Sequence, residues 1–227
     1  MTATGALRVG PNAIDCKIRI MASLLCVIGA YLIGSVSFAI VASWIFGLPD
    51  PRSYGSGNPG ATNVLRSGKR MAAACTLLGD AAKGFVVVLL SRHLAPVLGF
   101  GEATVAACAL AVFLGHLYPL YFGFKGGKGV STALGILLAL SPWAALVALA
   151  VFIAVAALSR YASLASILAA LSAIVVSPML LGWSSDLGAV VLIAALVVWR
   201  HRANIQRLQS GTETKLNLRQ GSAPPAA

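Results

Sequence analysis

"VSTALGILLALSPWAALVALAVFIAVAAL", residues 130–158, is the apolar stretch that decides how often the chain crosses a membrane. A helix rises about 1.5 Å per residue and needs roughly 20 residues to cross a bilayer. The stretch is therefore too long for one untilted crossing and short for two full ones. Ser141 and Pro142 in its middle divide it into two candidate helices.

The composition places the whole chain in a membrane. Its 227 residues are 59% hydrophobic and 10% charged, with a mean hydropathy of +0.88, which excludes a soluble globular domain. The apolar runs have helical length and lack the alternation of membrane β-strands. We predict an all-α integral membrane protein with one helical domain over residues 21–216. The four cysteines form no C-x-x-C pair and indicate neither a metal site nor a disulfide framework.

Further apolar runs give the remaining spans, and we expect about seven transmembrane helices, two of them short. These runs cover residues 20–48, 71–90, 103–121, 163–181 and 187–198. Residues 1–20 form an N-terminal extension, and Met21 leaves open whether this extension is disordered or precedes the true start. Residues 217–227 are expected to form a flexible C-terminal tail.

The distribution of Lys and Arg decides the topology. Basic clusters lie between the first two spans, after the third span and after the last one, and such clusters belong on the cytoplasmic side. A fold-back at Ser141 and Pro142 places Arg160 on that same side, whereas a single crossing would place Arg160 and the basic C-terminus outside. We therefore predict a cytoplasmic C-terminus and an external N-terminus, although the basic residues before the first span argue weakly against this.

Four polar segments then gather at one face, and their composition indicates an anion site. They are "YGSGNPGATNVLRSGKR" (54–70), "YFGFKGGKGVST" (121–132), "SRYASLAS" (159–166) and "RHRANIQRLQSGTETK" (200–215). Glycines allow close backbone approach, helix N-termini carry partial positive charge, and Arg or Lys supplies the full charge. Lys128 directly precedes the helix expected from Val130. The ligand is predicted to carry phosphate.

Common phosphate-handling and acyl-transfer motifs are absent. Lys128 is followed by Gly129 where a P-loop needs Ser or Thr. The six acidic residues are too dispersed for a magnesium cluster, so we expect no metal and no cofactor. No histidine has an Asp four or five residues beyond it, and there is no G-x-S-x-G elbow. An obvious protein general base is missing.

Three motifs resemble the bacterial acyl-phosphate-dependent glycerol-3-phosphate acyltransferases (PlsY). They are "GSGNPGATNVLR", "GHLYPLYFGFKGGKGVST" and "HRANIQRLQSGTETK", and the resemblance extends from about Met21 to Lys215. It implies transfer of a fatty acyl group from acyl-phosphate to the 1-hydroxyl of sn-glycerol 3-phosphate, giving lysophosphatidic acid and phosphate. It also implies a multi-pass protein of the bacterial inner membrane and an upstream enzyme that supplies acyl-phosphate. One departure is Ser37, where the family often has proline.

The resemblance assigns the site residues. Those expected to be catalytic are Ser56, Arg66, Lys128, His201 and Asn204. The expected phosphate-binding set is Ser56, Gly57, Asn58, Gly60, Thr62, Asn63, Arg66, Gly126, Gly127, Lys128, Ser166, His201 and Asn204. Structural alternatives stay open: Thr62 and Asn63 could cap a helix, and Ser166 could make a helix-packing contact.

Other expectations concern partners and supporting residues. Membrane lipids are partners, and nucleic acid is not. Asp80 and Lys83, one turn apart, are predicted to form a structural ion pair near the site. The small residues Ala133 and Gly135 are predicted to border an acyl groove. The rival function is a membrane carrier for organic phosphates, which the lack of an internal repeat disfavours.

Overall fold

The computed structural model describes residues 13–216. The predicted C-terminal tail and most of the predicted N-terminal extension lie outside the described residues, and the expected boundary at residue 20 falls inside the first helix. The helices are α1 (Ala13–Gly34), α2 (Phe38–Ile45), α3 (Ala61–Leu65), α4 (Arg70–Leu98), α5 (Glu102–Leu117), the 3-10 turn η1 (Leu120–Phe122), α6 (Val130–Leu140), α7 (Pro142–Ser159), α8 (Ala162–Leu181), α9 (Ser185–Arg200) and α10 (Arg202–Gln209). The described chain contains no strand, which confirms the all-α class.

Within this part of the chain, five helical segments are long and apolar enough to cross a membrane. They are α1, α4, α5 with η1, α7 and α8. A sixth is obtained if α9 and α10, which meet at an angle of 52°, count as one bent span, and α6 is a shorter apolar helix. The protein is thus a multi-pass helical membrane protein, and the expected count of about seven spans stays a prediction.

The predicted break in the long apolar stretch is confirmed. Helix α6 ends at Leu140 and α7 begins at Pro142, and the Ser141 hydroxyl accepts a hydrogen bond from the Ala144 N–H at 3.4 Å. The last carbonyls of a helix have no partner within that helix. At the end of α6, Arg92 of α4 donates to one of them, the Ala139 carbonyl, at 2.7 Å. The same guanidinium pairs with Asp186 at the start of α9, also at 2.7 Å.

The prediction of a single span over residues 20–48 is wrong, because the chain breaks between α1 and α2. Gly34 lies so close to α5 that a Cβ there would stand 2.2 Å from the Val112 carbonyl oxygen. After this contact the chain leaves the helix, and the Lys83 ammonium of α4 donates to the Val36 carbonyl at 2.7 Å. Lys83 also pairs with Asp80 at 2.8 Å, which confirms the predicted ion pair. The break therefore forms without the proline that the resemblance led us to look for.

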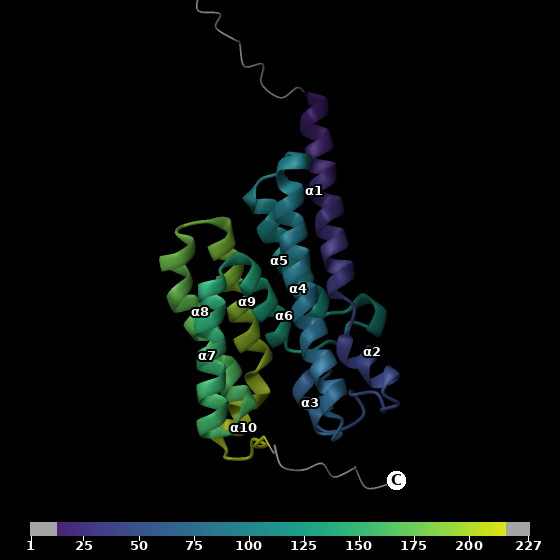
Figure 1. Ribbon diagram of the computed structural model, residues 1–227, viewed down its shortest axis with the longest axis vertical. Helices are drawn as coiled ribbons and strands as arrows, with labels where there is room; N and C mark the ends of the chain where they lie inside the picture. The colour runs from purple at the N-terminus through teal and green to yellow at the C-terminus, as the bar shows by residue number, and fades with distance from the viewer. Residues whose placement is uncertain (1–12, 217–227) are drawn as a thin grey trace, which may run out of the picture.

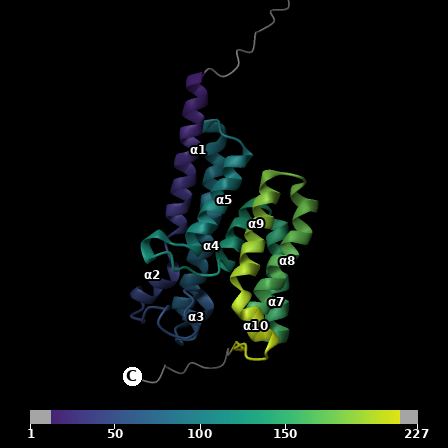
Figure 2. The ribbon, with the colours of Figure 1, turned by 180° about the vertical axis from the view of Figure 1, so that it is seen from behind.

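The helices form two groups joined by α6 (Figures 1 and 2). Helices α1, α4 and α5 pack together, with α2 and α3 at one end, while α7, α8 and α9 form the second group with α10 at the same end. Helix α6 packs against both α4 and α7, and α5 contacts α9. The start of α1 lies at the opposite end (Figure 1). All four polar segments meet at the end occupied by α3 and α10, as the charge pattern predicted.

Close packing of α6 on α4 depends on two glycines. A Cβ at Gly84 would lie 2.5 Å from the Thr132 carbonyl oxygen, and one at Gly135 would lie 1.9 Å from the Ala81 carbonyl oxygen. Gly135 therefore lies in a helix contact, so the expectation that it borders an acyl groove is wrong. The contact fixes the depth at which α6, and with it the loop before Val130, sits in the protein.

We predict that Gly135→Ala destabilises the protein by about 1–3 kcal/mol, because the added methyl overlaps backbone that cannot easily move. Thermal unfolding in detergent should show a midpoint lower by roughly 2–10 °C. Gly188→Ala is the matched control, because nothing lies within 4 Å of a Cβ at that helical position. Equal midpoints for the two variants would contradict the assigned contact.

Candidate functional site

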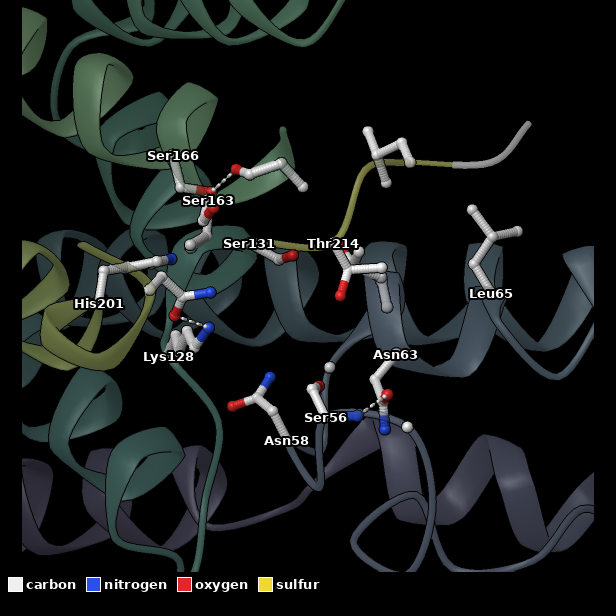
Figure 3. A pocket seen from close by; sticks show the side chains of 18 of the residues that line it. Ser56, Asn58, Asn63, Leu65, Lys128, Ser131, Ser163, Ser166, His201 and Thr214 are labelled. Atoms are coloured by element: carbon white, nitrogen blue, oxygen red, sulfur yellow. Dashed lines mark hydrogen bonds between the residues drawn. The ribbon is translucent and has the colours of Figure 1, made fainter. Parts of the chain in front are cut away.

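A pocket of about 840 Å³ opens where the four polar segments meet. Figure 3 shows Lys128, His201, Ser163 and Ser166 on one side of it and Ser56, Asn58 and Asn63 on the other. The predicted site residues that line the pocket are Ser56, Asn58, Gly60, Thr62, Asn63, Arg66, Lys128, Ser166, His201 and Asn204. Gly57, Gly126 and Gly127 are not among the lining residues. Residues from all four segments, far apart in the sequence, thus face one cavity.

Asn63 shapes the first wall of the pocket. Its amide nitrogen donates to the carbonyls of Pro51 and Tyr54 at 2.7 and 3.2 Å, and its amide oxygen accepts from the Ser56 N–H at 2.9 Å. The side chain is buried, so both ends of its amide are occupied by the loop. The prediction that Asn63 contacts a phosphate is therefore not supported, and its role is to hold Ser56 in place.

Lys128 projects into the pocket just before α6. Gly129, between Lys128 and α6, has a left-handed φ of +81°, and a Cβ there would lie 2.3 Å from the Phe113 ring, so only glycine fits. The Lys128 ammonium donates to the Asn204 amide oxygen at 2.5 Å. Burial lowers the pKa of Lys128 to about 8; Glu213 opposes this shift, and the guanidinium groups of Arg207, Arg200 and Arg66 add to it.

Glu213 organises the wall opposite Asn63. One carboxylate oxygen accepts from the Ser163 hydroxyl at 2.7 Å and from the Asn204 amide at 2.6 Å, and the other accepts from Arg207 at 2.7 Å. Burial alone would raise the pKa of Glu213, but these hydrogen bonds outweigh it and hold the pKa below its usual value. A chain of contacts therefore runs from Glu213 through Asn204 to Lys128.

His201 presents one ring nitrogen for chemistry. It is 2% exposed, and its Nδ1 lies 2.7 Å from the Val197 carbonyl oxygen, which can only accept. Nδ1 therefore carries a proton, and in the neutral ring Nε2 is a hydrogen-bond acceptor. Because His201 lines the pocket, this acceptor is available to a ligand hydroxyl.

The pocket carries excess positive charge. Arg207 is paired with Glu213, and Asp80, which also lines the pocket, is paired with Lys83. Arg66, Lys128 and Lys215 line the same cavity and have no carboxylate partner within residues 13–216. A doubly charged anion is the complement of such a site.

Apolar side chains also line the pocket. They are Leu65 of α3, Leu77 of α4, Val130 of α6 and Phe152 of α7, and they lie among the polar groups described above. The arrangement can hold an anion and an alkyl chain at once. Among the described residues, no group of three His, Cys, Asp or Glu side chains is placed to hold a metal ion.

The set of site residues expected from the sequence lacked Ser131, Ser163, Arg207 and His116, which line the pocket. Asp80 lines it too, as expected of an ion pair near the site. The sequence also predicts that Glu213 orients Arg207 or Lys215, and the 2.7 Å pair of Glu213 with Arg207 confirms the first of these. The contacts of Ser163 and His116 depend on tertiary packing, for which the sequence gives no signal.

Comparison with known proteins gives consistent matches. Residues 24–211 match the family described as "Glycerol-3-phosphate acyltransferase". A glycerol-3-phosphate acyltransferase of Thiobacillus denitrificans is 53% identical over 199 residues, which are 88% of this chain and 100% of the relative. One of Bordetella pertussis is 54% identical over 202 residues, which are 87% and 93% of the two chains.

Two solved structures also resemble this chain. They are crystal structures of PlsY, an integral membrane glycerol 3-phosphate acyltransferase, in a glycerol 3-phosphate form and in a lysophosphatidic acid form. The first has a TM-score of 0.79 and 40% identity, and the second has 0.77 and 39%. Each match covers 86% of this chain and 96% of the other.

The lowered pKa of Lys128 predicts how anion binding depends on pH. The ammonium is charged below about pH 8, so affinity for sulfate, whose charge stays constant, should fall as pH rises through that value. The fall should approach about tenfold per pH unit above it, as measured by calorimetric titration. In Lys128→Arg the cation does not titrate, and the dependence should disappear. A dependence that persists in this variant would assign the titration to another group.

Proposed function

The chain belongs to the glycerol-3-phosphate acyltransferase family, and we propose that it transfers a fatty acyl group from acyl-phosphate to the 1-hydroxyl of sn-glycerol 3-phosphate. The products are lysophosphatidic acid and inorganic phosphate. The observation that carries the proposal is one pocket lined by cations without a carboxylate partner among the described residues, by hydroxyls and by apolar side chains. Both proposed substrates carry phosphate, and one carries an alkyl chain as well, so each part of the pocket has a use.

The main task of the site in the proposed reaction is to position the two substrates, because the acyl donor needs no further activation. The carboxylic–phosphoric anhydride of acyl-phosphate is already reactive, and the hydroxyl oxygen of glycerol 3-phosphate attacks its acyl carbon. Negative charge then develops on the acyl oxygen, and the bond from the acyl carbon to the phosphate oxygen breaks. Arg66 and Lys128 stabilise this charge and hold the phosphates within reach of each other. Ser56, Thr62, Ser166 and Asn204 add hydrogen bonds.

The proton of the attacking hydroxyl has two acceptors. The departing phosphate can take it, in which case no protein base is required. His201 offers its Nε2 as a hydrogen-bond acceptor and so orients the hydroxyl toward the acyl carbon. In this role His201 acts in its neutral form, because only the neutral ring has a nitrogen that can accept a hydrogen bond from the hydroxyl.

The apolar side chains of the pocket give the acyl tail a place. Phe152 and Leu77 come from α7 and α4, two helices that the hydropathy criterion identifies as candidate membrane spans. The tail can therefore lie between them and extend into the lipid while the phosphate remains among the loops. This location replaces the groove expected beside Gly135.

The orientation in the membrane follows from charge. The Lys- and Arg-rich segments gather at the end of the protein where the pocket opens, so we place this end at the cytoplasmic side of the bacterial inner membrane together with the C-terminus. Water-soluble glycerol 3-phosphate reaches the pocket from there, and an upstream enzyme supplies acyl-phosphate. No feature of the described residues favours the carrier alternative, because the polar groups lie at one end rather than between two related halves.

We predict that Lys128→Ala lowers turnover of acyl-phosphate and glycerol 3-phosphate by about 100-fold or more, because an electrostatic contact to developing charge is lost. Release of phosphate and formation of lysophosphatidic acid by the purified protein measure this. Lys125→Ala is the matched control, because Lys125 is exposed and does not line the pocket. Movement of glycerol 3-phosphate across liposomes, without acyl transfer, would instead support the carrier.

We also predict that Phe152→Ala changes the preference for acyl-chain length. The ratio of kcat/KM for long over short acyl-phosphates should fall by roughly tenfold, because the contact with the tail is lost while the phosphate contacts remain. Ile153→Ala is the neighbouring control, because Ile153 is exposed on the outer surface and is not part of the pocket. An unchanged ratio in Phe152→Ala would show that the acyl tail does not contact Phe152.

A further inference from the structure

Arg200, at the last residue of α9, binds the glycine loop that precedes Lys128. Its guanidinium donates to the Gly126 carbonyl at 3.1 Å and to the Gly127 carbonyl at 3.0 Å. The same group lies 5.7 Å from the centre of the Tyr118 ring, which supports it from the side. Two consecutive carbonyl oxygens thus face one positive charge, although Arg200 itself does not line the pocket.

The loop is held from its other side by α5. The Gly127 N–H donates to the His116 carbonyl at 3.3 Å. A Cβ at Gly127 would lie 2.5 Å from the His116 ring nitrogen Nε2, and one at Gly126 would lie 2.1 Å from the His116 carbonyl oxygen. Both glycines are therefore required by the approach of the loop to α5. This explains why they were singled out by the sequence and yet are absent from the pocket wall.

The direction of one peptide bond gives this clamp a consequence for the site. The Gly127 carbonyl and the Lys128 N–H belong to the same trans peptide, in which the two groups point in opposite directions. Because the carbonyl faces Arg200, the Lys128 N–H faces away from it. Within residues 13–216 no acceptor takes this N–H, and Lys128 lines the pocket.

We propose that Arg200 is a positioning residue that fixes this peptide so that the Lys128 N–H, beside the Lys128 ammonium, donates to a bound phosphate. The proposal rests on the part of the proposed function that places a phosphate at Lys128. Arg200 acts in two ways. It removes the partial negative charge of two carbonyls from the neighbourhood of the anion, and it strengthens the donor N–H by polarising the peptide. A lysine at this position could reach only one carbonyl with comparable geometry.

A purely structural role for Arg200 is the alternative, because a cation in the last turn of a helix is favourable by itself. Direct binding of inorganic phosphate to the purified, detergent-solubilised protein separates the two roles and requires no turnover. Calorimetric titration gives the affinity, and thermal unfolding without phosphate gives the stability. The variants are Arg200→Gln, which removes the charge, and Arg200→Lys, which keeps it. Arg202→Gln is the matched control, because Arg202 is exposed and its cation stacks on Trp199 at 4.5 Å, away from the loop.

We expect Arg200→Gln to weaken phosphate binding about tenfold and Arg200→Lys to weaken it by a smaller factor, with Arg202→Gln equal to the unaltered protein. Unfolding midpoints without phosphate should stay together, and in turnover assays the KM of a phosphate substrate should rise more than kcat falls. The inference is overturned if either Arg200 variant binds phosphate as the unaltered protein does, or if Arg202→Gln shows the same loss. If Arg200→Gln does not fold, the phosphate affinity of Arg200→Lys alone tests the inference by the same criterion.

The same measurements keep the inference apart from the proposed function. Acyl transfer by a protein that binds no inorganic phosphate would overturn the inference and leave the function standing. Phosphate binding with the expected order of variants, but without acyl transfer, would support the inference and remove the function.

Discussion

The hydrogen bond from the Lys128 ammonium to the Asn204 amide is the contact on which the pocket depends. A cation recessed among apolar helices is costly unless polar partners replace its water. Asn204 serves Lys128 in this way, and Glu213 in turn fixes Asn204 while it also holds Ser163 and Arg207. One carboxylate from the chain beyond α10 thus orients groups of α8 and α10. Replacing such a network with apolar side chains would cost the fold little, because buried ion pairs seldom add net stability, so its presence is better explained by the anion it prepares for.

The same constraint explains where charged residues occur along the helices. Each helix that ends inside the protein exposes carbonyls or N–H groups that lipid cannot satisfy. At the break before α2, Lys83 donates a hydrogen bond to the Val36 carbonyl. At the end of α6, Arg92 donates one to the Ala139 carbonyl. These two cations are structural, whereas Arg66 and Lys128 have no carboxylate partner among the described residues. Cationic side chains therefore divide into those that bind freed backbone carbonyls and those that line the pocket.

The sequence predicted those features whose cause is local or compositional. Ser141 and Pro142 mark the break between α6 and α7 because their effect on a helix is intrinsic, and the basic loops share one end because charge controls topology. The break after Gly34 was missed, since its cause is the approach of α1 to Val112 and the supply of an ammonium by Lys83. The sequence identified Asn63 as a site residue but not its hydrogen bonds to the loop, because an amide that faces a ligand and one that holds a loop look alike in a motif. Arg200 was counted only as a basic residue of the last segment, and its contact with two carbonyls 73 and 74 residues earlier is a tertiary fact.

Two kinds of cation therefore act on the same loop, and their chemistry suits their places. A guanidinium is planar, stays charged at every relevant pH and can serve two acceptors at once, which fits Arg200 beside two consecutive carbonyls. An ammonium is compact and can lose its proton when buried, and burial lowers the pKa of Lys128 to about 8. A phosphate that enters the pocket stabilises the charged form of Lys128, so ligand and ammonium charge support each other. The permanent charge of Arg200 keeps the loop in place whether or not Lys128 is protonated, and this separation lets the binding residue respond to its ligand while the backbone around it stays fixed.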